Sequence, residues 1–191
     1  MRKLVMLTLA LGLAACGSGG AGNNASGDDE AAGNAAAAER RGTIGDSLAA
    51  SIDHSAFMQA LQSAGLADTL RGAGPYTVFA PTNAAWEAIP EETRRGLASE
   101  EGRERLITLL SYHIVSGTVT ADDLARAIER GEGGRAELAT VTGDNLSLSR
   151  DGDSIVVGDG AGGRARIVRA DQLQSNGAVH SIDAVLMPTG Q

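Results

Sequence analysis

The segment 74–86 (Gly-Pro-Tyr-Thr-Val-Phe-Ala-Pro-Thr-Asn-Ala-Ala-Trp) most constrains the fold, because it predicts a strand that runs directly into a helix. Residues 76–80 are mostly β-branched or aromatic, which favours a half-buried strand. Pro81 has no N–H to donate to a sheet, so the strand should end there, and Thr82 or Asn83 can then cap a helix. A core should gather around this segment, because it holds three of the five aromatic residues of the chain, Tyr76, Phe79 and Trp86.

Two predicted helix starts have the spacing of a capping box, in which a hydroxyl and an acidic side chain three residues later exchange hydrogen bonds with the backbone. Thr43 and Asp46 form one such pair, and Thr120 and Asp123 form the other. The first pair predicts that the folded domain begins at Thr43.

Two further helices have only a single candidate cap each. Asp53 or Ser55 can cap a helix that carries apolar residues over 57–64 and stops at a glycine. Ser99 can cap a longer helix, whose apolar face runs from residue 106 and ends on His113.

The second half of the sequence has the two-residue alternation of strands, beginning at about residue 136. Asp151-Gly152 predicts a tight hairpin turn, and the glycine-rich residues 158–163 predict a hairpin loop. Helices first and strands last, with one early strand, predict a single α+β domain rather than an alternating parallel-sheet fold. The expected late strands are residues 138–141, 146–149, 155–157, 166–169 and 178–186.

The N-terminal residues predict export and a lipid anchor. Arg2-Lys3 and the apolar run that follows have the form of a signal peptide over residues 1–15, and the run is too short to span a membrane. Leu13-Ala14-Ala15-Cys16 resembles the bacterial lipobox, in which cleavage leaves the cysteine as the lipid-bearing N-terminus. A plain secretory signal is the alternative. By the same resemblance, Gly17 after the cysteine favours the outer membrane.

Residues 16–42 are dominated by Gly, Ala, Ser and Asn and have no apolar periodicity. Such a segment cannot bury enough apolar surface to offset the entropy lost on ordering. We therefore expect a flexible, lipidated tether over residues 16–42 and one folded domain over residues 43–191.

Composition and motifs exclude several classes of function. The formal net charge of −8 argues against nucleic acid as a partner. A single cysteine excludes an intrachain disulfide and a cysteine-based metal site. The sequence lacks a nucleotide-binding loop, a dinucleotide fingerprint and a nucleophile elbow, so we expect no cofactor and no catalytic residue.

The three histidines, His54, His113 and His180, are the candidate metal ligands and acid–base groups. None has another ligand-type residue at a short spacing such as i, i+4, so we expect no metal site. We interpret His113 and His180 as partly buried histidines that hydrogen-bond to the backbone or to a carboxylate. A pH-sensitive contact is the alternative.

Three segments with distinctive residues follow one another between residues 44 and 188. The first is Thr77, Val78, Phe79, Ala80, Pro81, Thr82 and Asn83; the second is the pair Tyr112 and His113; the last includes Asn176, Gly177, His180, Ile182 and Asp183. In this order they resemble the signature segments of the fasciclin (FAS1) domain family, with Trp86 where the family usually has Phe. The resemblance implies a compact antiparallel β-wedge or sandwich packed with several helices.

The resemblance implies a non-enzymatic module for adhesion or binding, with a protein, polysaccharide or matrix partner. In animal members the Tyr-His segment is implicated in adhesion, which makes Tyr112 and His113 candidate interaction residues; the alternative is that they lock a helix end to the sheet. We expect a monomer at the bacterial cell envelope, held in the outer membrane by lipid on Cys16 and facing the periplasm or the cell surface. A small-ligand carrier or envelope sensor with a pocket between helices and sheet is the second hypothesis, and an enzyme the third.

Overall fold

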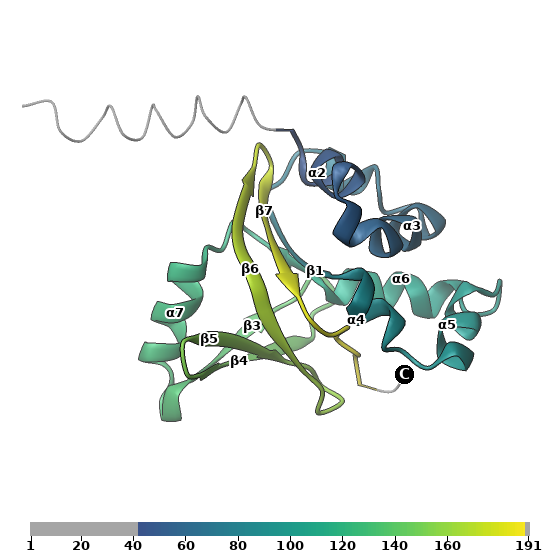
Figure 1. Cartoon of the computed structure of the whole chain (residues 1–191). Helices are drawn as coiled ribbons and strands as arrows, with labels where there is room; N and C mark the ends of the chain where they lie inside the picture. Colours follow the sequence, from purple (N-terminus) through teal and green to yellow (C-terminus); the bar gives the residue numbers. More distant parts are fainter. Residues whose placement is uncertain (1–41, 190–191) are drawn as a thin grey trace, which may run out of the picture.

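The computed structural model describes residues 42–189. The predicted signal peptide, Cys16 and residues 17–41 of the predicted tether lie outside the described residues. Figure 1 shows a strongly twisted sheet with one group of helices on its right and helix α7 on its left. The described helices, with short 3-10 helices marked η, are α2 (Ile44–Ala50), η1 (Ile52–His54), α3 (Ser55–Ala64), η2 (Thr69–Arg71), α4 (Asn83–Glu87), α5 (Glu91–Ala98), α6 (Arg103–Tyr112), α7 (Ala121–Arg130) and η3 (Glu132–Gly134).

In the described part of the chain, one seven-stranded sheet has the order β2-β1-β7-β6-β5-β4-β3. The α+β class and the single domain are confirmed. The sheet is not wholly antiparallel, because β1 and β7 pair in parallel, with Tyr76 opposite Gly177. A parallel pair needs a long crossover between its strands, which the helices and the β3–β6 meander provide here. The strands are β1 (Tyr76–Pro81), β2 (Ile114–Ser116), β3 (Arg135–Ala139), β4 (Asn145–Asp151), β5 (Ser154–Gly158), β6 (Arg164–Gln174) and β7 (Gly177–Ile182).

The sheet curls until its two outer strands approach each other. Val115 of β2 forms an isolated bridge with Thr140, directly after β3. The N–H of Val141 donates to the carbonyl of Ile114 at 2.9 Å. The sheet is therefore close to a closed barrel.

Strand β1 lies between two apolar cores, as its alternating side chains require. Val78 and Ala80 pack with Phe57 and Leu109 of the helical group. Phe79 points to the other side, into the core inside the curled sheet under α7. The segment 74–86 is thus the junction of the two halves of the domain.

The capping boxes form as the sequence predicts. The hydroxyl of Thr43 accepts from the Asp46 N–H, and Asp46 bonds back to Thr43. Thr120 and Asp123 do the same at α7.

The other predicted caps are partly wrong. Thr82 caps α4, but neither Asp53 nor Ser55 caps α3, whose N-cap residue, His54, makes no capping bond. Helix α6 begins at Arg103 rather than after Ser99, because residues 99–102 form a turn. In that turn the Ser99 hydroxyl accepts from the Gly102 N–H at 3.1 Å.

The last strand is shorter than predicted, ending at Ile182 rather than near residue 186. The chain leaves the sheet at Asp183, whose carboxylate accepts from the Arg166 N–H at 2.6 Å. Leu186 is then buried, and its N–H donates to the His113 ring.

Candidate functional site

The first signature asparagine, Asn83, fixes the start of a neighbouring helix. Its side-chain oxygen accepts from the N–H of Ala56 at 3.0 Å, in the first turn of α3. Its amide nitrogen donates to the carbonyl of Ile52 at 2.8 Å. Asn83 therefore performs the role that the sequence assigned to Asp53 or Ser55, from a position 27 residues away from Ala56.

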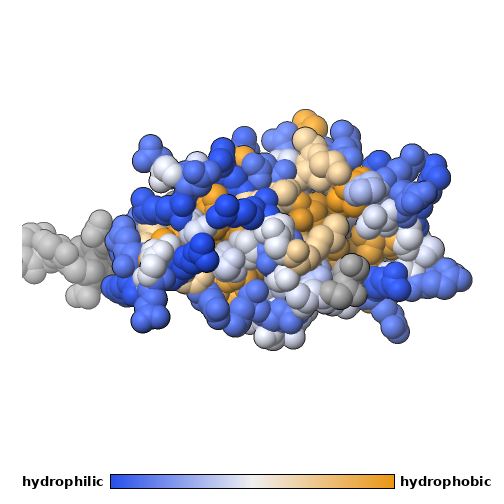
Figure 2. Space-filling view, turned by 90° about the horizontal axis from the view of Figure 1, so that it is seen from below, coloured by the Kyte–Doolittle hydropathy of each residue, from blue (hydrophilic) through white to orange (hydrophobic). Residues whose placement is uncertain are grey.

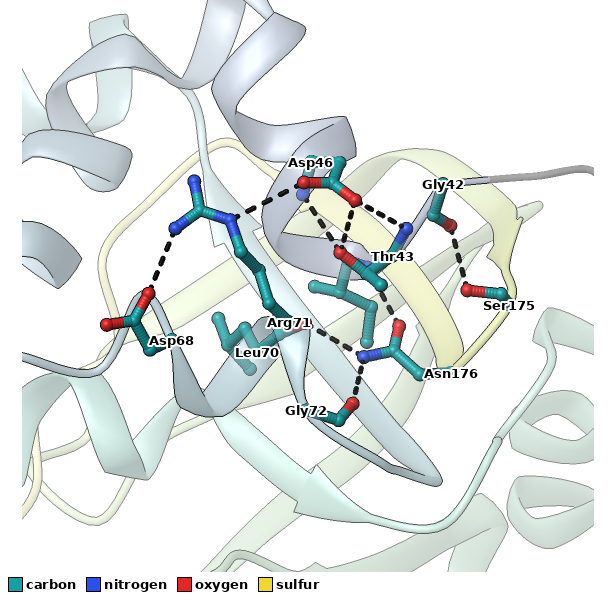
Figure 3. A network of polar contacts seen from close by, with 10 residues as sticks. Gly42, Thr43, Asp46, Asp68, Leu70, Arg71, Gly72, Ser175 and Asn176 are labelled. Carbon is teal, nitrogen blue, oxygen red and sulfur yellow. Dashed lines mark hydrogen bonds and ion pairs between the residues drawn. The ribbon is translucent and has the colours of Figure 1, made fainter.

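The second signature asparagine, Asn176, ties three parts of the chain together at the β6–β7 turn (Figure 3). Its side-chain oxygen accepts from the N–H of Ile44, the first residue of α2, at 2.8 Å. Its amide nitrogen donates to the carbonyls of Leu70 and Gly72, both at 2.8 Å. The signature asparagines thus act as long-range caps.

Asn176→Ala should lower the free energy of unfolding by about 2–3 kcal/mol, because it leaves the Ile44 N–H and two carbonyls without this partner. Urea unfolding followed by circular dichroism measures the change. Asn145→Ala is the matched control, because its exposed side chain bonds only to Glu137 within β3 and β4; we expect a loss within about 0.5 kcal/mol. Equal losses in the two variants would contradict the long-range cap.

Thr77 and His180 hold the loop before α7 in place. The Thr77 hydroxyl donates to the Gly117 carbonyl at 2.7 Å and accepts from the Val119 N–H at 2.8 Å. His180 Nε2 lies 2.8 Å from the Val119 carbonyl, and the Asp171 N–H donates to His180 Nδ1 at 3.2 Å. His180 is therefore the neutral Nε2–H tautomer, and burial lowers its pKa.

Tyr112 and His113 lie inside the protein, with exposed fractions of 1% and 0%. His113 Nδ1 is 2.7 Å from the Leu109 carbonyl, and the Leu186 N–H donates to Nε2 at 3.0 Å. The ring is therefore neutral, and burial lowers the pKa of His113 to about 4. The Tyr112 hydroxyl donates to the Asn145 carbonyl and accepts from the Gly160 N–H. Both side chains join the end of α6 to distant backbone, which is the locking role that the sequence also allowed.

A surface groove of about 530 Å³, which a ligand could enter, lies between α3, α4, α5 and α6. Its apolar walls include Ala60, Leu97 and Leu106, which are buried, and the half-buried indole of Trp86. Figure 2 views the molecule from below and shows apolar side chains gathered at the surface on the right, where Figure 1 places α4, α5 and α6. Sequence reasoning predicted a pocket between helices and sheet; the residues that line this one all come from the helices and the turn between α5 and α6.

The turn between α5 and α6 closes one end of the groove by close backbone packing. The Ser99 hydroxyl donates to the Gly96 carbonyl at 2.7 Å. A Cβ on Gly102 would lie 1.8 Å from that same carbonyl oxygen, so only glycine fits there. The two helices are thus held at a fixed separation next to Ser99, which lines the groove.

Charged residues also line the groove, at different depths. Arg103, Glu87 and Glu100 are exposed, whereas Arg94 is half-buried. The Nε atom of Arg94 is buried and has no hydrogen-bond partner within residues 42–189. No pattern in the sequence distinguishes this residue, because an arginine in a short amphipathic helix is normally solvated.

The remaining predicted sites give no further candidate. Within residues 42–189, no three His, Cys, Asp or Glu side chains gather as a metal ion would require. Over the same residues, no helix has the length and apolar character of a membrane span.

Comparisons with known proteins agree on one family. A family model described as "Fasciclin domain" matches residues 53–188. Protein sll1483 of Synechocystis sp. is 32% identical over 153 residues, which cover 80% of this chain and 77% of that protein. Transforming growth factor-beta-induced protein ig-h3 of Sus scrofa is 34% identical over 147 residues, covering 77% of this chain but 19% of that protein. The solved FAS1 domain pair from the insect cell adhesion molecule Fasciclin I matches with a TM-score of 0.54 and 26% identity, covering 69% of this chain and 44% of that one.

Proposed function

Because this chain belongs to the fasciclin domain family, we propose that it is a non-enzymatic binding module, held at the bacterial cell envelope by lipid on Cys16, that adheres to a protein, polysaccharide or matrix partner. Fasciclin I, the source of the matching FAS1 pair, is a cell adhesion molecule. The chain spans about a fifth of the length of ig-h3. The binding partner proposed for this chain is therefore not taken from that larger protein.

The engagement of His113 and His180 in internal hydrogen bonds is the observation that carries this proposal; His54 bonds to Ser51 through Nδ1, and its Nε2 is buried without a partner among the described residues. Both ring nitrogens of His113 and of His180 are bonded to backbone groups. A general base or a metal ligand needs a free ring nitrogen. The rings of His113 and His180 therefore support the structure of the domain, which favours a recognition function over an acid–base or metal-binding role for these two residues.

Cys16→Ser should move the protein from the outer-membrane fraction to the soluble fraction, because the predicted lipid has no other attachment point. Fractionation of cells that express each form, followed by immunoblotting, measures the distribution. Cells that carry the variant should also lose the surface adhesion that the wild-type protein confers. Continued membrane association of Cys16→Ser would refute the lipid anchor, and unchanged adhesion by cells that lack the protein altogether would refute the adhesive function.

Small-ligand carriage is the second candidate function, and the groove is the observation that favours it. A volume of about 530 Å³ is within the range of small-molecule sites, which are commonly 300–1,000 Å³, about the size that a drug-like or lipid-like molecule needs. Apolar walls with a few polar groups are also typical of such sites.

A further inference from the structure

We propose that the groove between α3, α4, α5 and α6 binds a monocarboxylate with an apolar body, and that the guanidinium of Arg94 receives the carboxylate. This inference rests on the second proposed function, small-ligand binding, and names its ligand class. It begins from a buried side-chain donor of a groove-lining residue: Arg94 Nε has no hydrogen-bond partner in the part of the chain that the structure describes. A buried N–H without a partner costs free energy, which an acceptor on a bound ligand would recover once the half-buried Arg94 side chain turns towards it.

The charge of Arg94 is also unpaired, in contrast to that of its neighbour. Arg95, on the same helix, forms an ion pair with Glu91. No ion pair of Arg94 is found among the described residues, although Arg94 is the less exposed of the two. A planar guanidinium with a free edge matches the two oxygens of a carboxylate.

The apolar walls define the rest of the ligand. Leu97 and Leu106 are 6% and 5% exposed and flank the groove together with Ala60 and the Trp86 indole. The Trp86 ring is held in place by an edge-on contact with Phe57, with centroids 6.4 Å apart. An aliphatic or aromatic ligand body would cover these side chains and gain the free energy of removing them from water.

The charges that line the groove favour a ligand with a single negative charge. Glu87 and Glu100 are exposed and line the groove, opposite in sign to Arg94 and Arg103. The two glutamates offset the two arginines, so the lining has no net positive charge to hold further anionic groups. A polyanion such as a nucleotide or an acidic polysaccharide is therefore a poor fit to this groove.

Trp86 provides the readout, because it is the only tryptophan in the chain and it lines the groove. The full chain carrying Cys16→Ser, purified without detergent, is titrated with decanoate and with decanol below their aggregation concentrations. We expect decanoate to change Trp86 fluorescence saturably and decanol to bind about tenfold more weakly or worse, because it lacks the charged acceptor.

Three variants locate the site. Arg94→Met should weaken decanoate binding about tenfold while leaving decanol binding unchanged, and Arg95→Met, the matched control, should bind decanoate like the parent. Ser63→Phe, at an exposed groove position of α3, should block both ligands by filling the groove. Thermal melts verify that each variant is folded.

The outcomes distinguish the assignment of Arg94 as the carboxylate site from small-ligand binding in the groove as such. If decanol binds as tightly as decanoate, or if Arg94→Met and Arg95→Met behave alike, the carboxylate assignment is wrong while small-ligand binding stands. If neither ligand binds, or if Ser63→Phe blocks neither, small-ligand carriage in this groove is wrong as well. Adhesion through another surface is unaffected by either result.

Discussion

Gly177→Ala should prevent the domain from folding at physiological temperature. Gly177 has φ +148°, and a Cβ at this position would lie 1.8 Å from the carbonyl oxygen of Tyr76. The obstacle is the backbone of the neighbouring strand, so no side chain can move to relieve it. The parallel β1–β7 pairing would have to separate, at a cost of about 4 kcal/mol or more, which is a large share of the stability of a domain of this size. Circular dichroism and urea unfolding of the purified variant measure the loss.

Gly143→Ala is the control that separates backbone strain from collision. Gly143 also has positive φ, +90°, but an added Cβ would meet no heavy atom within 4 Å. Its replacement should cost only the strain of the left-handed region, about 1–2 kcal/mol. A Gly177→Ala protein that is no less stable than Gly143→Ala would show that β7 tolerates displacement from β1.

Acidification from pH 7 to pH 4 should destabilise the domain by about 3 kcal/mol through His113 alone. Burial holds the pKa of His113 at about 4, below its ordinary value of 6.5. Between these values the unfolded chain binds a proton that the folded chain does not. The free energy of unfolding that depends on the uncharged His113 ring is therefore fully present above pH 6.5 and is lost as the pH falls through 4. Burial lowers the pKa values of His180 and His54 as well, so they add to the loss in the same direction.

The measurement is the free energy of unfolding in urea at a series of pH values. His113→Gln lowers stability at every pH but should reduce the slope between pH 6.5 and 4, since one proton-binding difference is removed. Asp46 and Asp123 have lowered pKa values through their bonds to Thr43 and Thr120, so their contribution is lost only below their ordinary pKa of 3.8. An unchanged slope in His113→Gln would contradict the buried, neutral His113.

Interactions that are local in the sequence were predictable, and long-range ones were not. The Thr43–Asp46 box involves residues three apart, so its spacing is visible in the sequence. Asn176 reaches Ile44 across 132 residues, and nothing near Ile44 indicates that its N–H has such a partner. The signature segments marked both asparagines as important without indicating what they bind.

The groove shows the same limit for a binding site. Its walls come from four helices, and its shape depends on how α5 turns into α6 at Gly102. The sequence predicted a core around Trp86, and the indole packs against the helical core with an edge-on contact to Phe57, whereas Phe79 lies in the other core. That Trp86 also lines the groove follows only from the packing of α5 and α6 beside it. Arg94 became a candidate only when the structure showed a buried Nε without a partner.

The contacts of Gly42 determine how mechanical force would enter the domain. The Gly42 carbonyl accepts from both the N–H and the hydroxyl of Ser175, at 3.1 and 3.2 Å. A pull applied to the chain ahead of Gly42, as the proposed lipid anchor would transmit, would therefore load the β6–β7 hairpin directly, and Asn176 would share that load with α2 (Figure 3). Helix α2 would thus not be the first element to detach under force, because the β6–β7 hairpin, the longest of the sheet, would resist the pull before it. The proposed adhesive function would gain from this attachment, because adhesion loads the domain through its N-terminal side.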